Sequence, residues 1–251
     1  MERVVIYTCI IGGYDELRQP LMPCSDVDYI CFVGPGEKTS DRIGVWQIRE
    51  LAVGDIPSGS RKGRKGLDAA LLSRYPKMHP HVLLPEYDAS LWIDGNIELR
   101  DRTVCKALST KLAAGVKYSG VAHPTRSNVY EEAVMCRNMG YISWWKLARV
   151  LVFLATHGEK RSGGALMENN IIFRRHNDPD IVRLDELWWD KVMTLCRRDQ
   201  LSFMWCLRKC GIPRDYLLPR GQNTRNHPGF RYLKHEERII CQGICYITNI
   251  Y

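Results

Sequence analysis

The chain has no apolar run long enough to cross a bilayer. Its longest apolar stretch in a helical pattern, from Leu147 to Thr156, is interrupted by Arg149 and falls far short of the roughly 20 residues that a membrane-spanning helix needs. The first residues lack the basic segment, long apolar core and small-residue cleavage site of a secretory signal. Internal repeats and low-complexity tracts are also missing. We therefore expect a soluble, cytoplasmic protein.

Cysteine is too sparse for a disulfide scaffold. Ten cysteines lie among 251 residues, and Cys9 and Cys206 fall within apolar runs, which is typical of reduced core residues. We expect most of the ten to be reduced. The pairs Cys206/Cys210 and Cys241/Cys245 share a three-residue gap, but structural zinc sites usually have the closer CxxC spacing. Core packing is favoured over zinc.

The composition fits one α/β domain with a sizeable core, because 45% of the residues are hydrophobic and 25% are charged. The net charge of +8 and the pI near 9.0 favour an anionic partner. Nucleic acid, a phosphate-bearing small molecule and an acidic membrane surface all satisfy that condition. Charge alone does not choose among them.

Apolar, β-branched runs at residues 4–11 and 29–33 end at glycines, as buried strands do. Their alternation with helical patterns predicts an α/β fold, a mostly parallel sheet flanked by helices. Pro76 is expected to break the first helix or to begin a second one. The further expected strands are 45–51, 87–99, 116–122, 165–175 and 239–247, and the expected helices are 67–84, 101–114, 128–139, 143–156, 180–196 and 198–210.

The most informative segment is YDASLWIDGNIEL, residues 87–99. Its apolar strand ends in Asp94, Gly95 and Asn96, and ligands of open parallel sheets bind beyond the carboxyl ends of the strands. Oxygen-bearing side chains at that position suit Mg²⁺ or Mn²⁺ bridging two phosphates. An Asp-Gly-Asn sequence also forms tight hairpin turns, so both interpretations stand.

Basic residues precede this strand. The polar loop 58–66 carries four of them, and Arg74 and Lys77 follow in the predicted helix. Guanidinium and ammonium groups are suitable partners for a pyrophosphate leaving group. For each loop residue a solvated surface position is the simpler interpretation, whereas for Arg74 and Lys77 we favour function. The loop cations are Arg61, Lys62, Arg64 and Lys65.

Further polar residues are candidates for the site. Asp199 is either an active-site carboxylate or a charge that interacts favourably with a helix N-terminus. Asn169, next to Glu168 at the start of a predicted strand, either hydrogen-bonds a ligand or fixes a turn. His227 and His235 lie in a polar segment and could complete a metal shell, although a lone loop histidine is usually a surface residue.

Six segments in this order resemble a glycosyltransferase-like family, with plant and bacterial members, that was long catalogued as a domain of unknown function. Each segment is weak alone, but together they cover most of the chain. They are YTCIIGGYDEL at the N-terminus, DYICFV at 28–33, SRYPKMHPHVLLPEYDASLWIDGNIEL at 73–99, HPTRSNVYEEA at 123–133, ENNIIFRRHN at 168–177 and RRDQLSF at 197–203.

The resemblance implies a GT-A fold that binds a nucleotide-diphosphate sugar in a single domain, residues 1–251, with a donor-binding half (1–100) and an acceptor and catalytic half (101–251). More distantly, the order is similar to retaining transferases with an Asp-x-Asp motif, an Asp-Gln motif and a late histidine. On that analogy Asp94 and Asn96 are metal ligands with His235, and Asp199 lies near the transferred sugar. Asn96 replaces the usual second aspartate, and its neutral amide is a poorer ligand, so Mn²⁺ or Mg²⁺ dependence is a hypothesis.

We expect transfer of a sugar to an acceptor hydroxyl, on a glycan or another molecule. The donor-binding residues expected from the turn after the first strand are Thr8, Gly12, Gly13 and Tyr14, joined by Arg74, Lys77, Asp94, Asn96 and Asn169.

The stereochemistry of the transfer is left open by the sequence. An inverting reaction needs a carboxylate base, for which the candidates are Asp199, Glu131 and Glu168. In a retaining reaction the donor phosphate can serve as the base. Asp199 and Glu168 are the catalytic residues that we expect.

Two other functions compete with transfer. A nucleic-acid-binding module would use the positive charge and the tryptophan pairs Trp144/Trp145 and Trp188/Trp189, but the cations form no single dense stripe. A non-catalytic sugar-binding relative of the transferases stays open because of Asn96. Nucleic acid is not an expected partner, and association with a membrane surface is left open.

Overall fold

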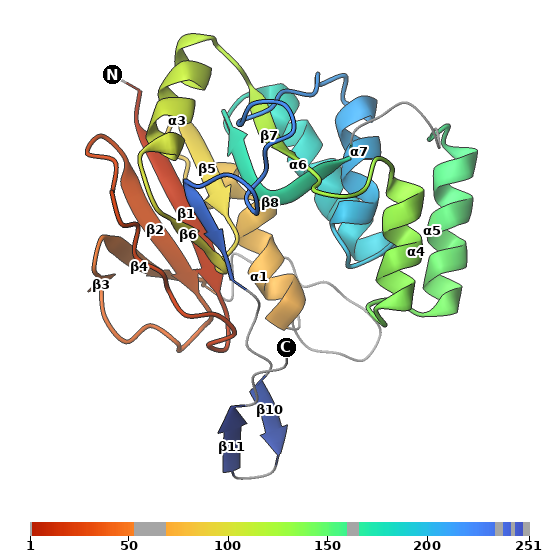
Figure 1. Ribbon diagram of the computed structural model, residues 1–251, viewed down its shortest axis with the longest axis horizontal. Helices are drawn as coiled ribbons and strands as arrows, with labels where there is room; N and C mark the ends of the chain where they lie inside the picture. Colours follow the sequence, from red (N-terminus) through yellow and green to blue (C-terminus); the bar gives the residue numbers. More distant parts are fainter. Residues whose placement is uncertain (1, 53–68, 160–165, 234–237, 242–243, 248–251) are drawn as a thin grey trace.

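The computed structural model describes residues 2–52, 69–159, 166–233, 238–241 and 244–247. Its centre is a seven-stranded sheet in the order β3-β4-β2-β1-β5-β8-β7 (Figure 1). Strands β1, β2, β4 and β5 pair in parallel, whereas β3 and β8 run antiparallel to their neighbours. The strands are β1 (Val4–Ile10), β2 (Asp28–Val33), β3 (Arg42–Ile43), β4 (Trp46–Glu50), β5 (Ala89–Ile93), β7 (Tyr118–Ala122) and β8 (Met167–Arg174).

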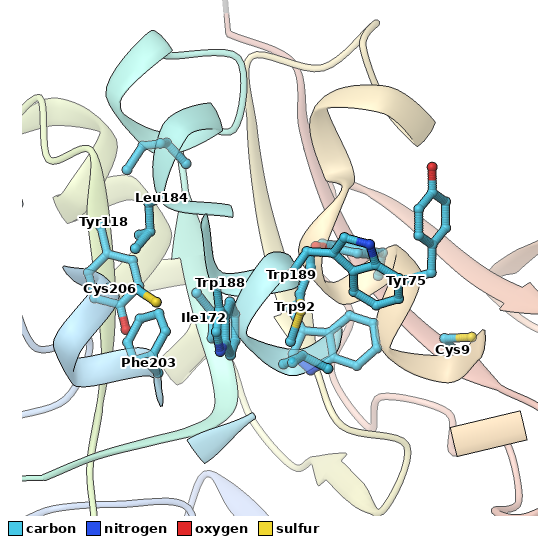
Figure 2. Close-up of a cluster of buried hydrophobic side chains, with 14 of the residues drawn as sticks. Cys9, Tyr75, Trp92, Tyr118, Ile172, Leu184, Trp188, Trp189, Phe203 and Cys206 are labelled. Carbon is cyan, nitrogen blue, oxygen red and sulfur yellow. The ribbon is translucent and has the colours of Figure 1, made fainter. Parts of the chain in front are cut away.

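Helices cover both faces of this sheet, which confirms the predicted α/β class. On one face α1, α6 and α7 pack against Tyr7, Trp92 and Ile172 (Figure 2). On the other face α3 packs against Ile6 and Leu91. The helices are α1 (Ala69–Met78), α2 (Pro80–Leu83), α3 (Thr103–Ala113), α4 (Val129–Asn138), α5 (Trp144–Thr156), α6 (Pro179–Thr194) and α7 (Gln200–Lys209).

Burial on both faces explains the composition of the central strands. Every residue of β1 is buried, with Val5, Tyr7 and Cys9 in the core on one face and Val4 and Ile6 in the core on the other. A strand covered on both sides needs apolar residues at successive positions rather than at alternate ones. The unbroken apolar run therefore identified the central strands correctly.

Pro76 does not break the first helix, contrary to the prediction. It lies inside α1, and the break comes at His79, whose backbone (φ −129°, ψ 45°) leaves the helical region. The residue before a proline is pushed away from the helical conformation, and Pro80 then takes the first position of α2. The second proline, not the first, separates the two helices.

The C-terminal part is more regular than predicted. Strand β9 (Phe230–Tyr232), in a segment expected to be irregular, pairs antiparallel with β6 (Ile97–Leu99). The single late strand expected at 239–247 is a hairpin of β10 (Arg238–Cys241) and β11 (Ile244–Ile247). Three- and four-residue strands give too short an alternation for a sequence pattern to resolve.

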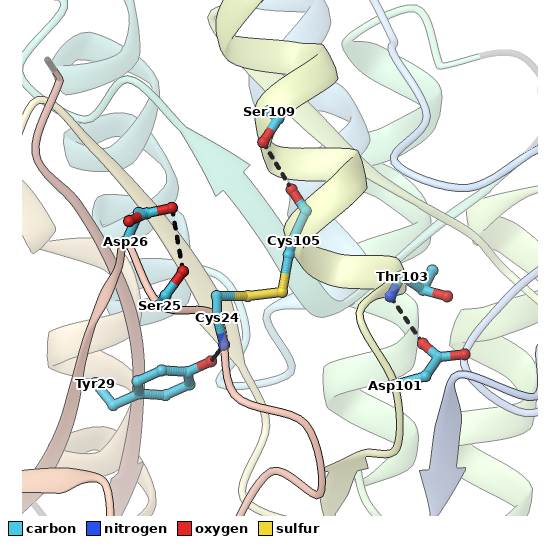
Figure 3. Close-up of a disulfide and its surroundings, with 8 residues drawn as sticks. All are labelled: Cys24, Ser25, Asp26, Tyr29, Asp101, Thr103, Cys105 and Ser109. Atoms are coloured by element: carbon cyan, nitrogen blue, oxygen red, sulfur yellow. Dashed lines mark hydrogen bonds between the residues drawn. A yellow bond between two sulfur atoms is a disulfide. The ribbon is translucent and has the colours of Figure 1, made fainter.

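One disulfide, Cys24–Cys105, joins the segment before β2 to α3 (Figure 3). No sequence pattern indicated this pair, because cysteines 81 residues apart carry no local signal of spatial proximity. Six other cysteines, including Cys9, Cys31, Cys206 and Cys210, are free and buried, as expected for most of them. Among the residues that the structure describes, no helix is both long and apolar enough to span a membrane.

Candidate active site

Polar residues from several elements meet at one edge of the sheet. Parallel strands β1 and β5 end there, shortly before Gly12 and Asp94, and β8 begins there because it runs in the opposite direction. The backbone N–H of Asp94 donates to the carbonyl of Asn170, 2.9 Å away, which ties β5 to the first residues of β8. This edge is where α/β sheets bind ligands.

Lys77 lies between two carboxylates at this edge. Its Nζ is 3.2 Å from Oδ1 of Asp94 and 3.0 Å from Oδ2 of Asp199. The indole N–H of Trp92 donates to the same Asp94 oxygen at 2.7 Å. We call Lys77, Asp94 and Asp199 the site bridge. It joins the last turn of α1, the end of β5 and the start of α7, three segments that the sequence analysis singled out separately.

Asp199 keeps its negative charge in a buried position. Burial by itself raises the pKa of this carboxyl, but the charges of Lys77, Arg74 and Arg198 outweigh burial and hold the pKa well below its usual range. The side chain does not cap α7, although Asp199 is the N-cap residue. Of the two interpretations of Asp199, the contacts support an active-site carboxylate over a simple helix-end charge.

A second ionic cluster lies around Glu168. Burial raises the pKa of its carboxyl, and the negative charges of Asp94 and Glu132 add to the rise, while an ion pair with Arg225 opposes it. Nearby, Arg126 pairs with Glu132 at 2.9 Å. Glu168 is therefore a more basic carboxylate than Asp199, since its conjugate acid holds its proton at higher pH.

Asn169 presents its side chain to a buried space. The residue is only 3% exposed, and within the described chain neither its amide nitrogen nor its amide oxygen has a hydrogen-bond partner. Its backbone N–H donates to the side-chain oxygen of Gln200 at 3.2 Å, and Gln200 in turn donates to the carbonyl of Met167. Burying an amide without partners is costly, so this side chain suits a ligand rather than the turn that was its alternative.

The described residues do not by themselves form the expected metal site. Asp94 Oδ1 already accepts from Lys77 and Trp92, and the Asn96 amide nitrogen donates to the carbonyl of Leu233 at 2.8 Å. Within the described ranges, no group of three or more His, Cys, Asp or Glu side chains could hold an ion. His235 lies outside the described residues. Lys77 already places a positive charge 3.2 Å from Oδ1 of Asp94.

The turn after β1 contains three of the four residues that were expected to bind the donor there, and two of them are glycines in the left-handed region. Gly12 and Gly13 have φ values of +66° and +62°, which favour glycine, and Tyr14 is 61% exposed. The Glu37 carboxylate accepts from the backbone N–H of Gly12 at 3.0 Å, which fixes the turn. Thr8 is instead buried within the sheet at 2% exposure, two residues before the strand ends.

Several expected residues lie elsewhere or have structural partners. Asn128 caps α4 by accepting from the backbone N–H of Glu131, and the Glu131 carboxylate accepts from the backbone N–H of Ser127 at 3.3 Å. The His227 ring accepts from the backbone N–H of Gly229. The loop cations at 61–65 lie outside the described residues. Sequence reasoning missed Trp92 and Arg225; the first belongs to an apolar strand and the second to a segment without periodicity, so neither had a signal.

A sheet edge that carries carboxylates, cations and an amide without a partner among the described residues is typical of a ligand-binding site in an α/β domain. The family model of the TOD1/MUCI70 glycosyltransferase-like domain matches residues 1–218. The chain belongs to this family, as the resemblance predicted. No curated protein sequence matches it.

Two solved structures are similar in fold. One is mouse xyloside xylosyltransferase 1 in its apo form, with 9% identity over 86% of this chain and 84% of that chain and a TM-score of 0.48. The other is the galactosyltransferase LgtC in complex with donor and acceptor sugar analogues, with 12% identity over 84% of this chain and 72% of that chain and a TM-score of 0.48. At these identities the likeness concerns the fold and not the site.

Proposed function

We propose that the chain transfers a sugar from a nucleotide-diphosphate sugar, hexosyl or pentosyl, to an acceptor hydroxyl on a glycan. The observation that carries this proposal is the site bridge, in which a buried lysine contacts two carboxylates at the carboxyl edge of the sheet. With Arg74 and Arg198, three cations face two carboxylates. This surplus of positive charge suits a pyrophosphate.

In this proposal Lys77 and Arg74 stabilise the leaving group. Negative charge accumulates on the diphosphate as its bond to the sugar breaks, and cations fixed in advance stabilise that charge where it develops. Asp94 and Asp199 hold the ammonium of Lys77 in position. Because Asp199 stays ionised, it is a poor proton acceptor, and we assign it to orienting the transferred sugar.

Glu168 is our candidate for the base of an inverting reaction. Its raised pKa makes it a better acceptor for the proton of the attacking hydroxyl than Asp199. In a retaining reaction the donor phosphate takes this proton, and Glu168 then only binds the acceptor. Asn169 would hydrogen-bond a sugar hydroxyl, since a hydroxyl both donates and accepts, as an amide requires.

The donor nucleotide would lie over the turn of Gly12 and Gly13, with the Tyr14 ring available to stack on the base. Residues 1–100 would thus supply most donor contacts, and residues 101–251 the catalytic and acceptor contacts. Thr8 stays in the donor-binding proposal as well: it is buried near the end of β1, and its hydroxyl has no hydrogen-bond partner among the described residues.

Mn²⁺ or Mg²⁺ stays a prediction. Asp94 would be the first ligand, with Asn96 and His235 as the predicted others, and the ion would neutralise the diphosphate. The contacts of Lys77 argue that an ammonium supplies part of this charge instead. Removing metal with EDTA should therefore lower nucleotide affinity only partly, whereas Lys77→Met should lower it further.

The cytoplasmic location that we predicted also remains untested, and the disulfide argues against it. Cytosolic thiols are kept reduced, whereas disulfides persist in the lumen of the secretory pathway and outside cells. We favour such an oxidising compartment because Cys24 and Cys105 are bonded. Non-reducing electrophoresis of the protein purified from its native cells, with thiols blocked at lysis, tests this point.

Calorimetric titration with nucleoside diphosphates, with and without Mn²⁺, tests the proposed function most directly. Micromolar binding of one nucleotide that disappears in Asp94→Ala supports a transferase. Binding to duplex DNA with a steep salt dependence, together with indifference to every nucleotide, would refute it. Nucleotide binding with no hydrolysis or transfer of any donor sugar identifies a non-catalytic relative instead.

A further inference from the structure

Two tryptophans are exposed in a protein that otherwise buries this residue. Trp144 and Trp145 are 67% and 77% exposed, and Tyr141 beside them is 53% exposed. The other five of the seven tryptophans are at most 8% exposed. We call Tyr141, Trp144 and Trp145 the aromatic tip. Exposed aromatic clusters mark binding surfaces more often than single exposed apolar residues do.

The aromatic tip is held rigidly by the backbone. Gly140, at φ +76°, ends α4, where the N–H groups of Gly140 and Tyr141 bond carbonyls of the last turn at 3.0 and 2.9 Å. Ser143 then caps α5 by accepting from the N–H of Lys146. Ile142 is buried in the core between the two helices and α7. A surface fixed in this way loses little conformational entropy on binding.

The aromatic tip is connected to the candidate active site through one side chain. The guanidinium of Arg198 lies 4.6 Å from the centre of the Tyr141 ring, and the next residue in the chain is Asp199 of the site bridge. The fold places α4 against α7 (Figure 1), so the start of α7 and the tip of the α4–α5 pair are neighbours. A chain-like ligand lying on the tip can therefore extend towards Asp199.

The chemistry of the aromatic tip combines rings with guanidinium groups. Arg137 lies 4.4 Å from the centre of the Trp144 ring, as Arg198 does at Tyr141. Sugar rings present apolar C–H faces, which stack on aromatic rings, and hydroxyl or carboxylate groups at their edges, which guanidinium groups can bind.

We infer that the aromatic tip is the binding platform for the glycan acceptor, several sugar units away from the unit that receives the transferred sugar. This inference rests on the proposed function and adds the site that holds the rest of the acceptor. Its occupant is an oligosaccharide or polysaccharide chain. Binding there needs no donor, so the platform can be tested independently of catalysis.

Affinity electrophoresis in native gels that contain soluble xylan, β-galactan or polygalacturonate tests the platform. We expect at least one polymer to retard the protein, and the variant Trp144→Ala/Trp145→Ala to lose about tenfold or more of that affinity, as expected when stacked aromatic anchors are removed. The matched control is Leu21→Ala/Met22→Ala, two apolar residues with 58% and 53% exposure outside the aromatic tip. It should migrate as the unmodified protein does.

Three outcomes would overturn the inference. The first is that the tryptophan variant is retarded as much as the unmodified protein, and the second is that no polymer retards the unmodified protein. The third is that the unmodified protein and the Leu21/Met22 control bind phosphatidylserine vesicles whereas the tryptophan variant does not. Calorimetry with the nucleoside diphosphates separates the two proposals. If the proposed function fails, no nucleotide binds, whatever the gels show; if only the platform fails, nucleotides still bind.

Discussion

Arg174 and Lys77 are two buried cations that are joined by a hydrogen bond from the Arg174 guanidinium to the Lys77 backbone. They differ in how far their surroundings are closed to solvent. Arg174, with its side chain 1% exposed, bonds Asp185 at 2.6 Å and the Tyr7 hydroxyl at 2.7 Å. It also donates to the backbone carbonyl of Lys77 at 2.5 Å. We call Arg174, Asp185 and Tyr7 the core cluster. The side chains of the site bridge lie closer to solvent, with Asp94 35% exposed.

The comparison separates two uses of buried charge. The core cluster is closed to solvent, so its charges have only protein partners and act on the fold. The site bridge opens at the sheet edge, so a ligand can reach its charges. Because Arg174 holds the carbonyl of Lys77, the core cluster also positions the residue that faces the ligand. Stability and binding should therefore respond to different substitutions.

The largest effect is expected in the core cluster. Asp185→Leu leaves the Arg174 charge buried without its partner, which typically costs about 3–5 kcal/mol of unfolding free energy. The double variant Arg174→Met/Asp185→Leu should recover much of that loss, because both charges are then gone. Urea unfolding measures these differences. Asp41→Leu, at the exposed pair with Lys38, is the control and should not change the unfolding midpoint.

If Asp185→Leu unfolds at the same urea concentration as the unmodified protein, the core cluster does not stabilise the fold in the way proposed. If the double variant is as unstable as the single one, the loss comes from packing rather than from an unpaired charge.

In the site bridge, Asp94→Asn should lower transfer without lowering stability. The substitution keeps the shape of the side chain and removes the charge that holds Lys77, and losing one such preorganised contact costs about 100-fold or more in turnover. Asp88→Asn is the matched control, because Asp88 is the exposed carboxylate at the opposite end of the same strand and accepts from the backbone of Arg3. Steady-state rates and urea midpoints should be measured on both. Equal rates for the two variants would contradict the role of the site bridge.

Acid should destabilise the fold through the buried His79 and His176, an effect that is partly offset by Asp185, whose pKa burial raises to about 7. Burial lowers the pKa of His79 and of His176 from 6.5 to about 4, and the Arg174 charge adds to the effect. Between pH 6.5 and 4 these histidines are therefore protonated in the unfolded chain but neutral in the folded chain. The free energy of unfolding falls as the pH falls through this range and levels off below it.

The size of this effect should be about 1–3 kcal/mol for each histidine. Urea unfolding at pH 7, 5.5 and 4.5 measures it, and His176→Asn should reduce the slope. A slope that is the same in this variant would show that other groups cause the loss of stability.

The smallest expected effect concerns the acidic limb of the activity profile. Arg225 opposes the rise in the pKa of Glu168, so Arg225→Met should raise that pKa further. If Glu168 is the base, activity in the variant should begin to fall at a pH higher by up to about one unit, while Glu168→Gln should remove the limb. An unchanged limb in Arg225→Met would assign the base to another group.

Sequence reasoning predicted the fold class correctly, and it predicted the place of Asp94 at the sheet edge for a definable reason. Apolar runs mark strands that are buried on both faces, and Asp94 follows such a run, so its place at the sheet edge depends only on strand order. Lys77 was singled out as one of the basic residues that precede the Asp94 strand, and Asp199 as a carboxylate at the start of a predicted helix that matches the Asp-Gln motif. Their contact with each other depends on how α1 and α7 pack, which no local pattern encodes.

Other features could not be predicted from local patterns. The Cys24–Cys105 pair, the contact of Arg225 with Glu168 and the pairing of β9 with β6 all join segments far apart in the chain. Pro76 misled the prediction, because tertiary packing of α1 against β1 and α6 tolerates a proline that an isolated helix would not. Trp92 was not predicted as a site residue because its ring lies in the core, and only its indole N–H contacts Asp94.

The position of β8 has a consequence for biosynthesis. This strand is synthesised after β5 and β7 yet lies between them in the sheet. The edges of β5 and β7 that face it therefore have no hydrogen-bond partners until β8 inserts. Open strand edges promote pairing between chains, and a chain released before β8 would expose two of them. Because the first residues of β8 include Glu168 and Asn169, the insertion that removes this aggregation hazard also brings both residues to the candidate site, to which α7 then adds Asp199.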